Sequence, residues 1–238
     1  MKMDVSQLKD KVIIITGASR GIGRATADVL EKCGAKLVLG SRNIEQLEQD
    51  SNGENILPIY VDVSNEQSVK QFVDTSMNQF GRIDILINAA GIGTFSSILE
   101  SDTKDFDDMI AINLRGTYLS CKYVGRHMKK QKEGQIINLV SIAGTTALAG
   151  CGGYSASKFG VFGLTKVLQT ELRRDGIRIT AVLPGSVDSS FWDEIEPKPD
   201  RSSMIPVESI AEHIAYLLCQ PTQSVVDEIT IMPPAGIL

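Results

Sequence analysis

A tyrosine and a lysine stand four residues apart in the segment Tyr154–Lys158. Residues at this spacing share one face of a helix, so the phenol and the ammonium are expected to be neighbours. A free tyrosine has a pKa of about 10, but one ammonium about 4 Å away contributes roughly 4 kcal/mol at an effective dielectric constant near 20, or about three pKa units. The spacing therefore predicts a phenol whose pKa is lowered toward the working pH, where it can transfer protons.

A hydroxyl suited to the same chemistry precedes this pair. Ser141 ends an apolar segment of strand length. Its hydroxyl could hold a substrate oxygen by a hydrogen bond while charge develops on that oxygen. Cys151 could also touch a substrate, although such a cysteine is more often a small apolar filler. A Tyr-x-x-x-Lys pair alone is common on helix surfaces, and the preceding serine is what favours a catalytic site.

A glycine-rich segment near the chain start joins an apolar segment of strand length to one of helical period. It reads TGASRGIG, from Thr16 to Gly23, with the spacing G-x-x-x-G-x-G. Glycines permit a tight turn and let backbone N–H groups approach a pyrophosphate, and the following helix adds partial positive charge. We therefore expect a dinucleotide to be bound by Gly17, Ser19, Arg20, Gly21, Ile22 and Gly23.

The end of the second expected strand usually selects between the two nicotinamide cofactors. An acid about 20 residues after the glycines accepts hydrogen bonds from a free ribose 2′-hydroxyl and repels a 2′-phosphate. This chain has Ser41 and Arg42 there, and no acid. Arg42 can pair with a phosphate through its forked guanidinium, Ser41 can donate to it, and Arg20 adds a second cation. The sequence favours NADP over NAD, with a solvated surface role for Arg42 as the alternative.

Two further strand ends carry residues that suit the same ligand. Asp62, followed by Val63, could accept from an adenine amino group or could cap the next helix. Asn88, Ala89 and Gly91 end the fourth expected strand, where small residues let the backbone pass close to a cofactor. Asn88 could instead only tie its loop to the strand.

Apolar segments of strand length alternate with helical segments from end to end. Strands are expected at 11–16, 36–41, 56–62, 83–88, 135–141, 177–183 and 228–232. Helices are expected at 21–33, 44–49, 65–79, 104–128, 154–175 and 207–219, with Asn65 and Thr103 as caps and Gly176 as a terminator. This alternation predicts a Rossmann-type α/β fold, a doubly wound parallel sheet of about seven strands with helices on both faces. Its ligands bind beyond the carboxyl ends of the strands.

Composition narrows the function classes. The chain has 238 residues, of which 42% are hydrophobic, and a net charge of −5 at pH 7, which suits one domain over residues 1–238. A mildly acidic surface argues against nucleic acid and membrane as partners. The cysteines show no metal-ligand spacing and the first residues no apolar leader, so we expect a cytoplasmic protein without a metal site.

Over essentially its whole length the chain resembles the short-chain dehydrogenase/reductase family. The motifs that carry the resemblance are Thr16–Gly23, Asn88–Gly91, Asn113, Ser141, Tyr154–Lys158 and Pro184–Gly185. The resemblance implies a nicotinamide-dependent oxidoreductase in which Tyr154 is the acid or base and Ser141 orients the carbonyl or alcohol. Lys158 would also bind the nicotinamide ribose.

The resemblance implies roles for residues that spacing alone does not identify. Asn113 would hold a water in a proton relay to Lys158. Pro184 and Gly185 would belong to the cofactor site, and Val187 and Ser189 would meet the nicotinamide carboxamide. The family more often has threonine at the position of Ser189, but the hydroxyl is kept.

Residues 188–206 form a proline-rich, charge-mixed segment that we expect to be a substrate-loop insertion after the sixth strand. Phe191 and Trp192 lie in it, and Trp192 is the only tryptophan. The two rings are expected either to form a mobile lid over a small-molecule substrate or to pack into the core. The expected helix 154–175 is apolar on more than one face, which predicts a second subunit against it, in a homotetramer or homodimer.

Three functions remain open. The first is NADP-dependent interconversion of a small carbonyl and alcohol, and the C-terminal segment is closer to family members acting on hydroxy acids, sugars or other small carbonyls. The second is a 3-oxoacyl carrier-protein reductase, with a docking cluster formed by Lys129, Lys130, Lys132, Arg173 and Arg174. Those charges equally suit the C-termini of helices. The third is a non-catalytic NADP-binding scaffold, which would not need the intact set of catalytic residues.

Overall fold

One parallel sheet of seven strands forms the centre of the computed structural model, which describes residues 5–50, 53, 55–193, 195 and 198–237. The strands are β1 (Val12–Thr16), β2 (Lys36–Ser41), β3 (Ile56–Tyr60), β4 (Ile85–Asn88), β5 (Gly134–Leu139), β6 (Ile177–Pro184) and β9 (Glu228–Ile231). Their order is β3-β2-β1-β4-β5-β6-β9. The predicted Rossmann-type fold is confirmed.

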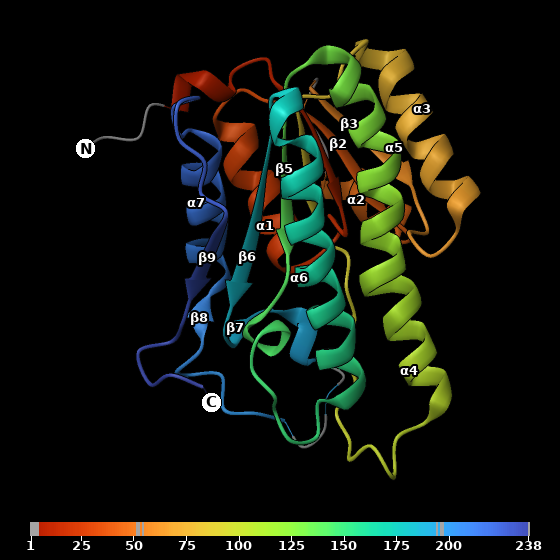
Figure 1. Cartoon of the computed structure of the whole chain (residues 1–238), viewed down its shortest axis with the longest axis vertical. Helices are drawn as coiled ribbons and strands as arrows, with labels where there is room; N and C mark the ends of the chain where they lie inside the picture. The colour runs from red at the N-terminus through yellow and green to blue at the C-terminus, as the bar shows by residue number, and fades with distance from the viewer. Residues whose placement is uncertain (1–4, 51–52, 54, 194, 196–197, 238) are drawn as a thin grey trace.

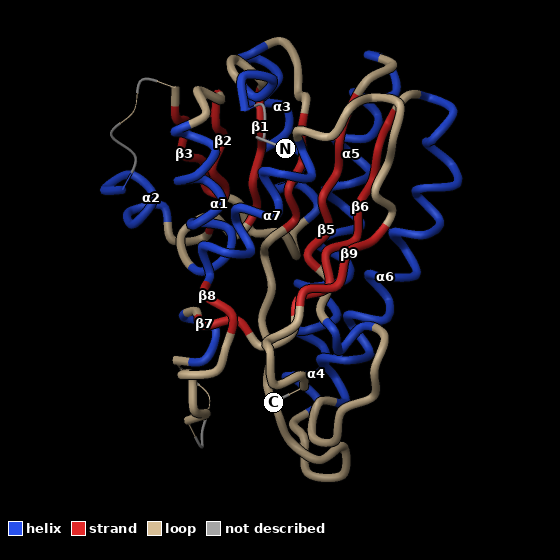
Figure 2. The backbone as a smooth tube through the Cα atoms, turned by 90° about the vertical axis from the view of Figure 1, so that its left-hand side faces the viewer, coloured by secondary structure: helices blue, strands red, loops and turns tan. Residues whose placement is uncertain are grey.

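Helices cover both faces of this sheet (Figures 1 and 2). They are α1 (Gly21–Lys32), α2 (Ile44–Asp50), α3 (Glu66–Phe80), α4 (Thr103–Met109), α5 (Gly116–Gln131), α6 (Gly152–Leu172) and α7 (Val207–Leu218). Helices α1 and α7 pack together on one face, and α5 packs between α3 and α6 on the other. Each layer buries its own apolar core against strands that are apolar on both sides.

The structure corrects the expected helix 104–128 in two respects, its N-terminal cap and its continuity. Its cap is Asp102, whose carboxylate accepts from the Lys104 backbone N–H at 2.8 Å, and not Thr103. Between α4 and α5 the backbone winds as a π-helix from Ile110 to Arg115. π-Helical turns are rare, and the helical period of this segment alone did not indicate one.

Short elements complete the chain. Single 3-10 turns lie at Val5–Leu8, Ile142–Gly144, Arg173–Asp175 and Ser190–Trp192. Two short strands outside the main sheet, β7 (Val187–Asp188) and β8 (Ile205–Pro206), pair in parallel and close the base of the segment 188–206. The prediction that Asn65 caps the third helix is confirmed, because its side chain accepts from two backbone N–H groups of α3.

A buried polar network ties the central strands to the helices. Asn88 of β4 and Asn138 of β5 are register partners, and the Asn88 amide donates to the Asn138 side-chain oxygen at 2.8 Å. Asn138 donates in turn to the Thr165 hydroxyl of α6 at 2.9 Å. Asn88 Oδ1 has no hydrogen-bond partner among the described residues, but the other side-chain polar atoms of the two asparagines do, so the pair can lie inside an otherwise apolar layer.

The core predicts a sharp contrast between two leucines. Leu37 of β2 is fully buried, whereas Leu99 in the loop before α4 is 91% exposed. Leu37→Ala should lower the free energy of unfolding by about 2–5 kcal/mol, because it leaves a cavity. Leu99→Ala, the matched control, should change it by less than about 0.5 kcal/mol. Urea unfolding followed by circular dichroism measures both, and equal losses would contradict the assigned core.

Candidate active site

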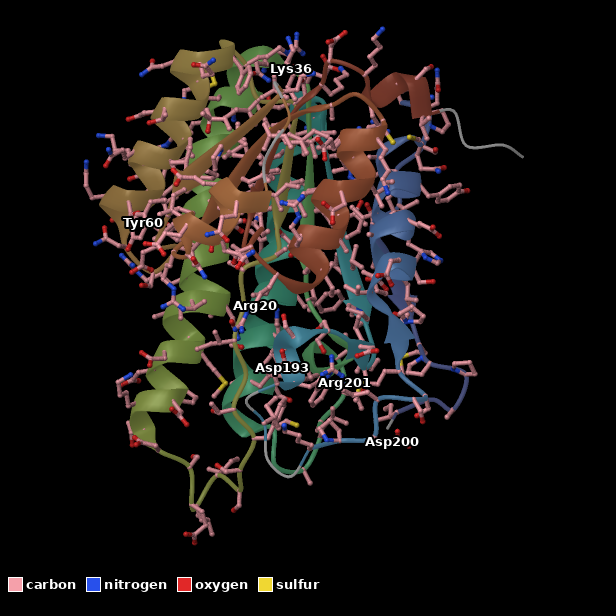
Figure 3. All side chains as sticks on the ribbon, turned by 180° about the vertical axis from the view of Figure 1, so that it is seen from behind. Arg20, Lys36, Tyr60, Asp193, Asp200 and Arg201 are labelled. Atoms are coloured by element: carbon pink, nitrogen blue, oxygen red, sulfur yellow. The ribbon has the colours of Figure 1, made fainter. Side chains whose placement is uncertain are left out.

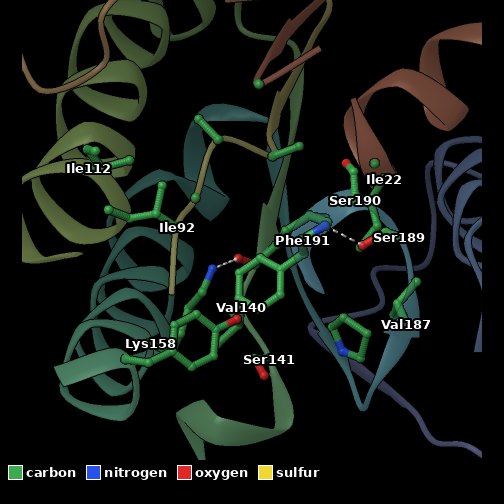
Figure 4. A pocket seen from close by; sticks show the side chains of 18 of the residues that line it. Ile22, Ile92, Ile112, Val140, Ser141, Lys158, Val187, Ser189, Ser190 and Phe191 are labelled. Carbon is green, nitrogen blue, oxygen red and sulfur yellow. Dashed lines mark hydrogen bonds between the residues drawn. The ribbon is translucent and has the colours of Figure 1, made fainter. Parts of the chain in front are cut away.

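A continuous pocket of about 460 Å³ lies at the carboxyl edge of the sheet. It is reached by the loops that follow β1, β2, β3, β4, β5 and β6, and by the N-terminal turns of α6. The strand order reverses between β1 and β4, which opens a crevice at this edge. Figure 4 shows side chains from these different loops converging on one space.

Tyr154 and Ser141 meet inside this pocket. Tyr154 lies in the first turn of α6, and Ser141 follows β5 as the cap of the turn Ile142–Gly144. The Ser141 oxygen accepts from the Ala143 backbone N–H at 3.1 Å, which fixes its position. The Ser141 hydroxyl lies close enough to the Tyr154 phenol to lower the pKa of that phenol. The structure therefore brings together the two groups that the sequence separated by 13 positions.

Lys158 lies one helical turn beyond Tyr154, with its ammonium 5.7 Å from the centre of the phenol ring. It is only 6% exposed, and its Nζ donates to the Leu139 carbonyl at 2.9 Å (Figure 4). The predicted shared face of Tyr154 and Lys158 is present, but the ammonium is directed at a strand-end carbonyl.

The prediction that Lys158 lowers the pKa of Tyr154 toward neutrality is wrong for the arrangement in this structure. Burial raises the pKa of Tyr154 to about 12, and the hydrogen bond from Ser141 offsets only part of that rise. Burial also lowers the pKa of Lys158 to about 8. Desolvation penalises the charged form of both groups, and the spacing argument ignored that cost.

Asn113 lies in the π-helix and holds a neighbouring loop. Its side chain accepts from the Ile92 backbone N–H and donates to the Ile92 carbonyl, each at 2.9 Å. It also donates to the Ser157 hydroxyl of α6 at 2.9 Å. A Cβ added at Gly91 would lie 3.3 Å from Asn113 Oδ1 and 3.6 Å from Lys158 Nζ, so these two groups flank the same glycine.

The glycine loop has the shape that a pyrophosphate cradle requires. Gly17 has a φ of +71°, and a Cβ there would lie 2.6 Å from the Ala90 backbone. A Cβ at Gly23 would lie 2.3 Å from the Gly17 carbonyl oxygen, so α1 can begin close to the loop only with glycine there. The residues of this loop fit a dinucleotide, since backbone N–H groups and the start of α1 face the pocket.

The end of the pocket beyond this loop is rich in donors. The Ser41 hydroxyl donates to the Ser19 hydroxyl at 2.9 Å, and Arg20 and Arg42 both line the pocket. Among the described lining residues, Asp62 is the one with an acidic side chain. One of its carboxylate oxygens accepts from the backbone and the hydroxyl of Ser64, which forms a tight turn before α3. Asp62 therefore faces the pocket and also stabilises its own loop.

Most of the predicted site residues line this one pocket, and three do not. Gly23 packs behind the glycine loop, Asn113 braces Ile92, and the Asn88 side chain points into the buried network with Asn138. The Asn88 side chain therefore ties its strand into the core, and the close passage of its backbone to a cofactor stays a prediction. The lining residues that were predicted are Gly17, Ser19, Arg20, Gly21, Ile22, Ser41, Arg42, Asp62, Val63, Ala89, Gly91, Ser141, Cys151, Tyr154, Lys158, Pro184, Gly185, Val187, Ser189, Phe191 and Trp192.

The segment after β7 carries Phe191 and Trp192 onto the pocket. Phe191 packs against Tyr154 with ring centres 5.7 Å apart. Arg201 holds this segment from outside, through Asp188 at 2.6 Å, Asp193 at 2.8 Å and the Ser189 carbonyl at 2.8 Å (Figure 3). The rings form a wall of the pocket and are not packed into the core, and the mobile lid stays a prediction.

Several lining residues were not singled out from the sequence, and three of them matter for the substrate. Phe95 follows β4 and contacts Tyr154, Ser190 follows β7, and Ile237 belongs to the C-terminal segment after β9. The Ser190 hydroxyl is buried and has no hydrogen-bond partner among the described residues. Because β9 is parallel to β6, the segment that follows β9 emerges at the carboxyl edge of the sheet, where ligands bind. This is the one feature that could have indicated Ile237 as a lining residue.

All four cysteines are free thiols. Among the described residues no group of three or more histidine, cysteine or acidic side chains could hold a metal ion. No described helix combines the length and apolarity needed to cross a membrane.

Comparisons with known proteins agree with this geometry. The family model of short chain dehydrogenases matches residues 11–200. An uncharacterised oxidoreductase of Staphylococcus aureus (strain USA300) is 36% identical over 229 residues, which cover 95% of this chain and 98% of the relative.

Two solved structures are similar over nearly the whole chain. An alcohol dehydrogenase from the archaeon Thermococcus sibiricus, complexed with 5-hydroxy-NADP, is 30% identical with a TM-score of 0.86, over 94% of this chain and 96% of that one. A 3-ketoacyl-(acyl-carrier-protein) reductase from Brucella melitensis, complexed with NADH, is 28% identical with a TM-score of 0.86, over 97% of this chain and 100% of that one. With the glycine loop and the Ser141–Tyr154 pair in one pocket, these matches establish that the chain belongs to the short-chain dehydrogenase family and is an oxidoreductase.

Proposed function

We propose that this protein uses NADP to interconvert a carbonyl and a secondary alcohol on a small substrate. The observation that carries the proposal is that Ser141 and Tyr154 line the same pocket as the glycine loop. When bound, the reduced nicotinamide supplies the hydride, and the protein's own groups manage the proton and the developing charge.

The roles of the catalytic residues follow from their environments. Tyr154, with a pKa of about 12, is protonated at neutral pH and is poised to give its proton to the substrate oxygen during reduction. Ser141 donates a hydrogen bond to the same oxygen as it becomes an alkoxide. Lys158 and Asn113, which flank Gly91, belong to the proton relay that the family resemblance implies, and Asn113 also holds Ile92 and Ser157 in place. Through this relay the Tyr154 phenolate regains a proton from solvent water.

The preference for NADP rests on charge. Arg20 and Arg42 line the donor-rich end of the pocket, together with Ser19 and Ser41. One similar structure holds 5-hydroxy-NADP and another holds NADH, so similarity does not select the cofactor. The proposal for NADP therefore rests on the two guanidinium groups. A 2′-phosphate beside two guanidinium groups is favoured because charge-assisted hydrogen bonds are about twice as strong as neutral ones.

A carrier-protein reductase has weaker support. The basic residues after α5 and α6 lie where those helices return to the amino edge of the sheet, whereas the pocket lies at the carboxyl edge (Figure 1). Lys129 and Lys132 pair with Asp175, and Arg173 pairs with Asp227. These pairs fit the alternative that the charges stabilise helix ends. A scaffold without turnover is opposed by the complete set of catalytic groups.

A homodimer or homotetramer is part of the proposal. Helices α5 and α6 leave a row of large apolar side chains on the surface, with Tyr118 45%, Phe159 45% and Val167 54% exposed. A helix with apolar residues on its outer face is stabilised by cover from another element. A second copy that packs α5 and α6 against the same helices would supply it.

Removing the phenolic hydroxyl tests the catalytic assignment. Tyr154→Phe should lower kcat for ketone reduction by about 100-fold or more, since positioned proton donors contribute roughly 10²–10⁴-fold. NADPH absorbance measures the rate. Tyr216→Phe, at a 46% exposed tyrosine of α7, is the control and should retain full activity. Unchanged turnover in Tyr154→Phe would sink the assigned mechanism and would favour another proton donor.

Removing the guanidinium at the donor-rich end tests the cofactor. Arg42→Ala should raise the KM for NADPH by about 10–100-fold, since a hydrogen bond to a charged group contributes roughly 1.5–3 kcal/mol. The KM for NADH should change by less than about threefold, because NADH lacks the 2′-phosphate. Arg174→Ala, at the opposite edge of the sheet, should change neither. Equal effects on both cofactors would refute the role of Arg42.

The buried lysine predicts a dependence of stability on pH. The pKa of Lys158 is about 8 in the folded state and lies below the usual value of 10.5, so the unfolded chain binds more protons between these limits. The free energy of unfolding therefore rises with pH in this window. Between pH 7.5 and 9.5, wild type should gain about 2 kcal/mol relative to Lys158→Met.

Urea unfolding at several pH values measures this difference, and Lys130→Met is the control. Lys130 is exposed on the surface, so its variant should follow wild type. The raised pKa of Tyr154 acts only above pH 10 and does not enter the window. Parallel pH curves for wild type and Lys158→Met would contradict the burial of this ammonium.

A further inference from the structure

The pocket is divided by charge. Its charged lining residues in the described part of the chain are Arg20, Arg42, Asp62 and Lys158. The first three follow β1, β2 and β3, on the cofactor side of the crevice. Lys158 is buried and donates to the Leu139 carbonyl. The side formed after β4, β5, β6 and β9 therefore offers a substrate no other charged side chain among the described lining residues.

Four aromatic rings build this uncharged side. Phe95 packs edge-on against Tyr154 at 5.7 Å between ring centres and against Phe191 at 6.1 Å, and it stacks on Trp192 at 5.7 Å. Phe191 meets Trp192 edge-on at 5.4 Å. Phe95, Phe191 and Trp192 thus form a continuous aromatic wall that ends at the Tyr154 phenol.

The aromatic wall is fixed and shows only apolar surface. The Trp192 indole N–H, its one polar group, donates to the Val187 carbonyl at 2.9 Å. Arg201 binds the backbone and acids of the same segment from outside. A Cβ at Gly93 would lie 2.5 Å from the Phe191 ring, so glycine there allows the rings to close up.

Few polar atoms remain on this side. Ser141 and Tyr154 are the reacting pair, and the hydroxyls of Ser189 and Ser190 lie toward the glycine loop, each 3.9 Å from a Cβ added at Gly21. The C-terminal segment completes the enclosure with an aliphatic side chain, because a turn with Gly236 N–H donating to the Pro233 carbonyl at 2.9 Å brings Ile237 to the pocket.

We propose that the substrate is an uncharged ketone, or the corresponding secondary alcohol, that carries an aromatic ring. This proposal rests on the proposed function, since it names the substrate class of the same site. The carbonyl oxygen meets Ser141 and Tyr154, and the ring lies against Phe95, Phe191 and Trp192. This class differs from the hydroxy acids and sugars that the C-terminal segment suggested.

The cost of removing water from charged or hydroxyl-rich substrates argues against acids, phosphates and sugars at this site. A carboxylate or phosphate placed against the aromatic wall would lose its water and find no described cation except the occupied Lys158. Each extra hydroxyl of a sugar would likewise lose a hydrogen bond to water without a partner. An aromatic ring loses nothing on burial and gains edge-to-face contacts with the wall.

Trp192 allows binding to be measured without turnover, because it is the only tryptophan and belongs to the wall. Full-length protein with saturating NADP⁺, which cannot reduce a ketone, is titrated with acetophenone and with 4-acetylbenzoate. Acetophenone should quench Trp192 fluorescence with a Kd at least about tenfold lower than that of the carboxylate. N-acetyltryptophanamide corrects for light absorption by the ligands. Equal or tighter binding of 4-acetylbenzoate would overturn the substrate class.

A charge introduced at the pocket rim gives an independent test. Ile237 is 52% exposed, so Ile237→Lys should fold, and it should lower the ratio of the Kd for 4-acetylbenzoate to the Kd for acetophenone by about threefold. Val225→Lys, at a 36% exposed position outside the pocket, is the matched control and should change neither Kd. An unchanged ratio of the two Kd values in Ile237→Lys would contradict the contact between Ile237 and the substrate.

Turnover separates this inference from the proposed function. With NADPH, wild type should reduce acetophenone with a kcat/KM at least about tenfold above those for 4-acetylbenzoate and dihydroxyacetone. If acetophenone quenches Trp192 but no ketone is reduced, the proposed function fails and the binding class stands. If dihydroxyacetone is reduced most efficiently and Tyr154→Phe abolishes that reaction, the proposed function stands and the substrate class is wrong.

Discussion

The alignment of the parallel strands at one edge of the sheet is the constraint on which the site depends. Thr16 of β1 is the register partner of Asn88 in β4, and Asn88 is the partner of Asn138 in β5. The chain therefore leaves these three strands at the same level, and the glycine loop, the Ala89–Gly91 segment and Ser141 emerge side by side. The amide pair of Asn88 and Asn138 stabilises that register from inside the core.

Burial governs the electrostatics of the catalytic groups more than their spacing does. The Tyr154 phenol and the Lys158 ammonium share a helix face, yet loss of hydration at both favours their neutral forms. The Leu139 carbonyl, freed at the end of β5, gives the ammonium a partner. The raised pKa keeps Tyr154 protonated at neutral pH, as the proposed reduction of a carbonyl requires.

The division of the pocket follows from the order of the strands. Loops after β1, β2 and β3 supply glycines, hydroxyls and guanidinium groups, while loops after β4, β6 and β9 supply aromatic and aliphatic side chains. A ligand with an ionic end and an apolar reacting partner fits such a divided space. Arg201 contributes from outside the pocket by holding the segment that carries Phe191 and Trp192.

Local patterns in the sequence were enough to predict the sheet, the helices and most of the residues that line the pocket, because strand length, helical period and loop position are local properties. The π-helix around Asn113, the inward direction of Asn88 and the arrival of Ile237 at the pocket depend on distant segments. The raised pKa of Tyr154 could not be predicted from a four-residue spacing, since desolvation is set by every atom packed around the phenol. Residue types therefore determined the chemistry that is available, and tertiary packing decided which groups face the pocket and which of them keep their charge.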